Sequence, residues 1–238
     1  MNGWYQLLKG ALGTYVRVLI RKVVLLGEVD LHPGPKIIVG NHPNASDGFT
    51  LLPTIKEHLH FAVMGDVFTL PFIGMVLKNA KQIPTYRKQA ERFVRDAGVY
   101  LAQGEPVVIF PEGKLNMDTG IRKAGLGAAR LSNASGAPLL PIGIHVPSEH
   151  IRIIKSHMFG RDTVGSWQFG GKIYLNFGAS FHLPVLPAGD ERENLQKQTQ
   201  FIMDRISELA EEAREFALRQ FGQQPGLVNK PNPTQSEP

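Results

Sequence analysis

A histidine and an aspartate five positions apart, His42 and Asp47, form a pattern that suits acid–base chemistry. A carboxylate that binds one nitrogen of an imidazole fixes its tautomer and leaves the other nitrogen free as a general base. On one regular helix the two side chains would point roughly 140° apart, since each residue turns about 100°. His42 is therefore expected to precede a helix, so that Asp47 on the second turn reaches back toward the imidazole.

The residues around this pair predict such a junction. The apolar run 37–39 is typical of a short buried strand that stops at Gly40, and Pro43 suits the first position of a helix, where a missing N–H costs nothing. A nucleophilic serine or cysteine is not needed if the substrate brings its own hydroxyl. The alternative is a helix-capping histidine beside a solvated aspartate, which is the commoner role for such a pair on its own.

A second carboxylate, Glu112, follows another short apolar run at 107–110. Ligands of open α/β sheets bind outside the carboxyl ends of the strands, so Glu112 is expected on the same rim as His42. Gly113 would let a ligand approach the backbone closely, and Lys114 adds a cation. Taken alone, this stretch would be an ordinary turn.

A third short strand, predicted at 82–87, ends in Arg87. A cation there would stand on the same edge as the histidine and the carboxylates, although an isolated arginine is more often a surface charge. The combination of a base, two carboxylates and cations at strand ends favours a site on this rim over a set of unrelated surface features.

The elements that must position these residues follow from the alternation of apolar runs and helical stripes. Strands are predicted at 37–39, 60–64, 82–87, 107–110 and 139–144, with a late strand or hairpin at 167–177. Helices are predicted at 72–78, 89–103, 125–133 and 191–219. This order predicts a single α/β domain with a mostly parallel sheet flanked by helices and a long C-terminal helix.

The two ends of the chain differ from this domain. Residues 1–27 carry an apolar stripe at helical spacing with basic residues opposite, which predicts an amphipathic N-terminal helix. Charges interrupt the stripe well short of the roughly 20 apolar residues that span a bilayer. Such a helix suits a membrane interface or, equally, the protein's own core, and both alternatives stay open. Residues 222–238 are proline-rich and poor in apolar residues, which predicts a disordered tail.

Composition limits the classes of partner. The chain has 238 residues, a formal net charge of +5 and no cysteine. The positive charge favours anionic partners: a membrane surface, a phosphorylated substrate or, most weakly, nucleic acid, since the basic residues are spread along the chain. Without cysteine, disulfides, thiolate metal sites and cysteine nucleophiles are excluded, and no spacing of metal ligands is apparent.

Four blocks of the chain resemble, in order, those of the glycerol-phosphate acyltransferase superfamily, and especially of the 1-acylglycerol-3-phosphate acyltransferases. The blocks are Asn41-His42-Pro43-Asn44-Ala45-Ser46-Asp47, Pro71-Phe72-Ile73-Gly74 with Ala80-Lys81-Gln82-Ile83-Pro84-Thr85-Tyr86-Arg87, Phe110-Pro111-Glu112-Gly113-Lys114-Leu115, and Pro138-Leu139-Leu140-Pro141-Ile142. They lie within residues 36–145; each is weak alone, and their common order makes the resemblance specific. The resemblance implies an acyltransferase domain over 28–221.

The resemblance also implies roles. His42 would deprotonate the hydroxyl of the acceptor, and Asp47 would orient the imidazole and stabilise its charged form. The acceptor would be held by Arg87, Glu112, Gly113 and Lys114. The third block departs from the family in having Leu115 where an arginine is usual, and Lys114 would partly stand in for that arginine. No metal or redox cofactor is implied, because the acceptor attacks the thioester of acyl-CoA or acyl-carrier protein directly.

The expected protein is therefore a peripheral enzyme on the cytoplasmic face of a membrane. It would bind anionic lipids and an acyl thioester, with acyl-carrier protein as a candidate partner, and it would acylate a lysophospholipid such as lysophosphatidic acid, without binding nucleic acid. Two alternatives remain: the same chemistry on another acceptor, such as a lyso-aminolipid or glycerol-3-phosphate, and a non-catalytic module that binds membrane lipids.

Overall fold

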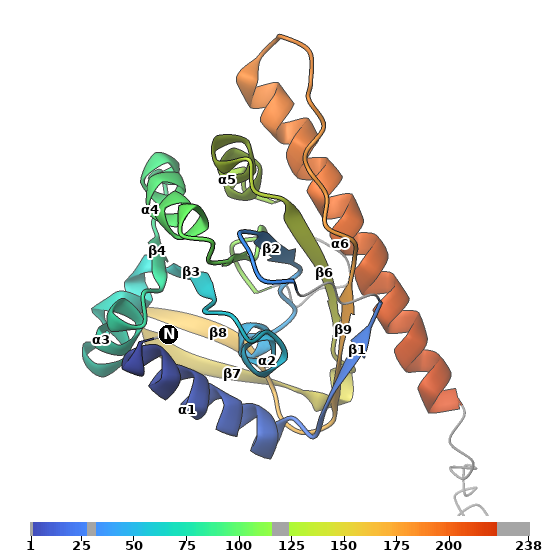
Figure 1. Ribbon diagram of the computed structural model, residues 1–238. Helices are drawn as coiled ribbons and strands as arrows, with labels where there is room; N and C mark the ends of the chain where they lie inside the picture. The colour runs from blue at the N-terminus through green and yellow to red at the C-terminus, as the bar shows by residue number, and fades with distance from the viewer. Residues whose placement is uncertain (1, 28–31, 116–123, 223–238) are drawn as a thin grey trace, which may run out of the picture.

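A computed structural model of the chain describes residues 2–27, 32–115 and 124–222. Its main sheet has strand order β1-β9-β6-β2-β5-β3-β4 (Figure 1). The strands of this sheet are β1 (Lys22–Leu26), β2 (Ile37–Gly40), β3 (His60–Met64), β4 (Ile83–Thr85), β5 (Val107–Ile109), β6 (Leu139–His145) and β9 (Lys172–Phe177). All neighbouring pairs run parallel except β6 and β9. The expected α/β fold with a mostly parallel sheet is thus confirmed.

Helices cover both faces of this sheet. The helices are α1 (Gly3–Leu19), α2 (Asp47–Thr54), α3 (Pro71–Asn79), α4 (Ala90–Ala102), α5 (Gly127–Ser135) and α6 (Glu191–Gly222), with the short 3₁₀ helices η1 (Gly65–Thr69) and η2 (Ser148–His150). Two of them, α1 and α2, pack on one face, while α4, α5 and α6 pack on the other (Figure 1). The sheet is therefore the middle layer of three, which is why its strands are apolar on both sides.

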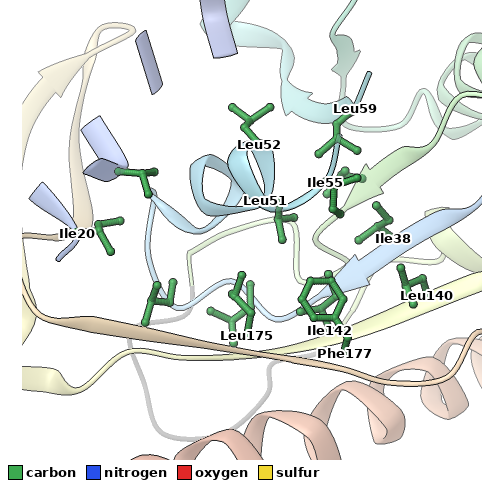
Figure 2. Close-up of a cluster of buried hydrophobic side chains, with 14 of the residues drawn as sticks. Ile20, Ile38, Leu51, Leu52, Ile55, Leu59, Leu140, Ile142, Leu175 and Phe177 are labelled. Carbon is green, nitrogen blue, oxygen red and sulfur yellow. The ribbon is translucent and has the colours of Figure 1, made fainter. Parts of the chain in front are cut away.

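The central strand β2 illustrates how the core is divided. Ile38 belongs to the cluster beneath α1 and α2, whereas Ile37 and Val39 belong to the cluster beneath α4, α5 and α6. This alternation is the period of two expected of a strand, and all three side chains are fully buried or nearly so. Figure 2 shows the first cluster, where apolar side chains of α2 meet those of the sheet.

Apart from the helix expected to begin at Pro43, the strands and helices predicted between residues 37 and 144, and the long C-terminal helix, are present, with ends that differ by at most three residues. Of the two alternatives for 167–177, the late strand is present as β9. The hairpin is not formed, because the segment contains the end of β8 (Arg161–Gln168) and then β9, which lie in different sheets. β8 instead pairs with β7 (Ile151–Met158), a strand that the sequence did not indicate. The predicted tail, 222–238, lies outside the described residues except for Gly222, which ends α6.

Two predictions about helices are wrong in detail. The N-terminal helix was expected over 1–27 but ends at Leu19, and residues 22–26 form β1, which joins the sheet beside β9. The apolar spacing in this stretch suits a strand as well as a helix, and pairing with β9 decides between them. Pro43 does not begin a helix either: the chain turns from 43 to 46, and α2 begins at Asp47.

The long helix α6 lies against β6 and β9 (Figure 1). This contact depends on Gly143 in β6, because a Cβ atom at that position would come within 2.1 Å of the backbone of Leu209 and Ala210 in α6. Within the part of the chain that the structure describes, α6 and the other helices lack the combination of length and apolar character needed to cross a membrane.

Candidate active site

The His42–Asp47 pair lies at the carboxyl end of β2. His42 follows the strand by two residues, and Asp47 is the first residue of α2. The Nδ1 atom of His42 lies 3.1 Å from Oδ2 of Asp47, so the expected contact between the two side chains is present. Asp47 is fully buried, whereas the His42 side chain is 20% exposed. The carboxylate is thus enclosed, and the imidazole stands where a substrate can reach it.

Asp47 is held by nitrogen donors on both oxygens. The backbone N–H of Asn44 donates to Oδ2 at 2.8 Å, and the side-chain amide of Asn44 donates to Oδ1. Burial raises the pKa of Asp47, and the hydrogen bonds from His42 and Asn44 oppose that rise by favouring the ionised form. Since a carboxylate only accepts, Nδ1 of His42 carries the proton in this contact and Nε2 is left as the acceptor.

The end of β5 fixes the imidazole from another direction. The ring of Phe110 stacks on that of His42, with centroids 4.2 Å apart and planes 8° from parallel. Glu112, which is buried, accepts the backbone N–H of His42 at 3.1 Å through Oε1. These contacts bring the first and third blocks of the sequence together. Phe110 was missed as a site residue because an aromatic at the end of an apolar run indicates core.

Asn41 is a second residue whose role the sequence pattern did not reveal. Its side-chain amide donates to the carbonyl of Ile144 at 2.8 Å, and its Oδ1 accepts the N–H of Ile144 at 2.7 Å. The amide therefore behaves as one more backbone unit between β2 and β6 and fixes the chain directly before His42. Its position beside the histidine in the first block was the available signal.

The predicted acceptor-binding residues lie on the same rim, where Glu112 contacts the backbone of His42 and Arg87 lies farther away. Arg87 follows β4, three strand spacings from β2 and so roughly 14 Å away across the sheet. Arg87 and Lys114 are both exposed, and neither forms a hydrogen bond or ion pair with another residue in the described ranges. Gly113 has a φ of +64°, in the left-handed region that favours glycine. Binding of an acceptor by these residues remains a prediction.

A group of possible metal ligands lies away from this rim. His58, His60 and Glu105 each offer a possible ligand atom within 4.8 Å of the others. Among residues 2–27, 32–115 and 124–222, no other group of three or more such side chains lies this close together. His60 begins β3, so the group sits at the amino end of the strands, opposite His42. The rings of His58 and His60 are stacked 14° from parallel, so their in-plane lone pairs do not converge on one ion. The group is therefore separate from the chemistry of the His42–Asp47 pair.

Comparison with known proteins shows which family the chain is similar to. The model of the family described as Acyltransferase matches residues 22–145, more than half of the chain. A 1-acyl-sn-glycerol-3-phosphate acyltransferase of Chlamydomonas reinhardtii is 27% identical over 126 residues, which are 51% of this chain and only 38% of that relative.

A solved structure shares the fold. The crystal structure of PlsC, the 1-acyl-sn-glycerophosphate (LPA) acyltransferase from Thermotoga maritima, superposes with a TM-score of 0.59 and 20% sequence identity. The match covers 90% of this chain and 78% of that one.

Proposed function

Since the chain belongs to the Acyltransferase family, we propose that it transfers a fatty acyl group from a thioester to the hydroxyl of a lysophospholipid, with 1-acylglycerol-3-phosphate as the favoured acceptor. The observation that carries the proposal is the His42–Asp47 contact of 3.1 Å at the rim of the sheet. It joins a buried carboxylate to a reachable imidazole, which is the arrangement a general base requires.

The reaction follows from the protonation state of this pair. Nε2 of His42 takes the proton of the acceptor hydroxyl while its oxygen attacks the thioester carbonyl. Asp47 stabilises the imidazolium that forms. The tetrahedral intermediate then collapses, the carbon–sulfur bond breaks, and the imidazolium returns its proton to the departing thiolate. An ester and a free thiol result, and no acyl-enzyme is formed, so no nucleophilic side chain is needed.

Acceptor recognition rests on the cations of the same rim. In this proposal Arg87 and Lys114 hold the acceptor phosphate, and Gly113 lets the acceptor approach the backbone. Lys114 supplies charge without the bidentate fork of the arginine that the family usually has at the position of Leu115. The site is therefore expected to select a phosphate monoester less strictly than an arginine would.

The proposal also places the protein on the cytoplasmic face of a membrane, with α1 in contact with anionic lipid. One face of α1 is part of the core, because Tyr5 and Val16 are buried. Other apolar side chains of the helix are open to solvent: Trp4 is 38%, Leu7 52% and Val18 68% exposed. The two alternatives left open by the sequence thus concern different faces of one helix, and an interfacial position suits the exposed face.

The direct test is product identification. The full chain is incubated with isotope-labelled acyl-CoA and a mixture of lysophosphatidic acid, glycerol-3-phosphate, lyso-aminolipids and monoacylglycerol, and acylated products are identified by mass. Phosphatidic acid as the main product is expected. Acylation of another acceptor would move the proposal to that substrate, and the absence of any acylated product, with acyl-CoA or acyl-carrier protein as donor, would favour a lipid-binding module.

A further inference from the structure

The stretch between the two members of the pair is irregular. Residues 43–46 form turns rather than a helix, so nothing in regular secondary structure fixes the distance between His42 and Asp47. Besides the hydrogen bonds of Asn44 with Asp47 and Ser46, the contacts that these four residues make with the rest of the protein therefore decide how far the imidazole lies from the carboxylate.

Strand β8 supplies the first set of these contacts. The backbone N–H of Ala45 donates to the carbonyl of Ser166 at 2.8 Å, and the hydroxyl of Ser166 donates to the carbonyl of Pro43 at 2.9 Å. Ser166 is only 1% exposed. The backbone of Ser166 thus binds Ala45 and its side chain binds Pro43, so one residue of β8 fixes two positions of the turn.

Helix α1 supplies the second set through Tyr15. The Tyr15 hydroxyl donates to the carbonyl of Gln168 at 2.7 Å and lies 2.9 Å from the hydroxyl of Ser46, while the N–H of Gln168 reaches the same serine oxygen at 3.3 Å. Because the tyrosine proton goes to the carbonyl, the Ser46 proton goes to the tyrosine oxygen. The result is a closed cycle of three hydrogen bonds. Burial raises the pKa of Tyr15, which keeps its phenol protonated and able to donate.

The Ser46 side chain forms this cycle of hydrogen bonds instead of capping α2. It occupies the N-cap position of α2, where a serine side chain ordinarily accepts an N–H of the first helical turn, yet it makes no such capping bond. A locally unfavourable choice next to a reactive group is expected where position matters more than helix stability. The residue that follows Ser46 is Asp47.

We infer that Tyr15 and Ser166 are positioning residues for the His42–Asp47 pair: α1 and β8 together clamp residues 43–46 and thereby set the distance between the imidazole and the carboxylate. This inference rests on the proposed function for its kinetic consequences. A loosened turn leaves the substrate sites intact but misaligns the base, so turnover falls while substrate affinity does not.

The test uses two variants of the full chain, Tyr15→Phe and Ser166→Ala, which each remove one hydroxyl. Tyr5→Phe is the control, because Tyr5 is another tyrosine of α1, fully buried, whose hydroxyl bonds the backbone of residues 57 and 59 and not the clamped turn. For each protein one measures kcat, KM for both substrates, thermal stability, and the proton resonance of His42 Nδ1–H, assigned by its loss in His42→Ala.

Both test variants are expected to lower kcat roughly ten- to a hundredfold with KM unchanged, since a misplacement of about 1 Å can have such an effect. They are also expected to weaken the His42 Nδ1–H resonance, whereas Tyr5→Phe lowers thermal stability without changing kcat or the resonance. Wild-type kcat and an intact resonance in both test variants would overturn the inference, as would an equal loss of kcat in Tyr5→Phe. If Tyr15→Phe fails to fold, Ser166→Ala decides alone. If the wild type transfers no acyl group, the proposed function fails, and the resonance still decides the inference.

Discussion

At the scale of single residues, the reactivity assigned to His42 depends on neighbours that do not react. Asn44 gives both a backbone and a side-chain N–H to Asp47, and Glu112 accepts the backbone N–H of His42. Phe110 limits the tilt of the imidazole by stacking on it. The contacts with Asn44 favour the ionised form of Asp47, and those with Glu112 and Phe110 favour one orientation of His42. Substitutions at these positions are therefore expected to change the rate of acyl transfer or its dependence on pH.

Asn44→Ala is expected to lower kcat roughly ten- to a hundredfold, because Asp47 loses a donor that favours its ionised form and the turn loses an acceptor for Ser46 N–H. With fewer donors the pKa of Asp47 rises further. Since the ionised carboxylate is the active form, activity is then lost at a higher pH on acidification. The pH profile of kcat measures this, and an acidic limb at the wild-type position would contradict the role given to Asn44.

Arg87→Ala is expected to raise KM for lysophosphatidic acid roughly ten- to a hundredfold, because a charge-assisted hydrogen bond is worth about 1.5–3 kcal/mol. KM for acyl-CoA is expected to change little. Lys88→Ala is the matched control, since it removes an equal charge from the next residue. If both variants raise KM alike, the effect is a general field and not phosphate binding by Arg87.

At the scale of elements, α1 has two different faces. Tyr15 reaches the turn beside Asp47, and Tyr5 binds the loop before β3, so the inner face is part of the fold around the site. The outer face exposes large apolar side chains with Arg17 in the last turn. This division predicts that substitutions on the outer face alter membrane binding without altering the site.

The double variant Leu7→Glu with Val18→Glu is expected to weaken binding to anionic vesicles strongly, because it places charge on the two most exposed large apolar side chains of α1. Thermal stability and activity on a soluble short-chain acceptor are expected to remain. Leu218→Glu offers a control, since that leucine is 54% exposed on α6. Vesicle flotation measures the difference; binding that persists in the double variant would show that α1 is not the contact.

The packing of α6 on β6 makes a second prediction at this scale. Gly143→Ala is expected to destabilise the protein by about 1–3 kcal/mol or more, because the added methyl group would overlap the backbone of α6. Gly98→Ala, in α4, has open space around the new methyl group and is expected to stabilise by roughly 0.5–1 kcal/mol. Urea unfolding of both variants gives the comparison, and a neutral Gly143→Ala would refute the described contact.

At the scale of the whole molecule, the apolar runs that become β2 and β5 predicted the sheet. Strands that are covered on both faces are apolar at every position, and this pattern is recognisable in the sequence. Their ends predicted the rim and the two residues that meet there, His42 and Asp47. Local patterns failed where distant contacts decide the structure. Residues 22–26 become a strand only through β9, and β7 is largely exposed without a regular alternation of apolar residues.

The same limit applies to the site. Pro43 suggested a helix start, but the contacts of the turn with Ser166 and of Ser46 with Tyr15 hold residues 43–46 out of a helix. These partners are more than thirty residues or more than a hundred residues away in the sequence, so no local spacing indicates them. The contact between His42 and Asp47 could be predicted from their types and spacing; the residues that we infer to align them could not.

The central claim is that His42 is the general base of an acyl transfer. The most direct measurement is the rate at which wild type and His42→Ala form phosphatidic acid from lysophosphatidic acid and acyl-CoA, with circular dichroism and thermal unfolding confirming that both are folded. The rate in the variant is predicted to be lower by ~10²–10⁴, the usual contribution of a positioned general base. A folded His42→Ala protein that keeps more than half of the wild-type rate would contradict the claim.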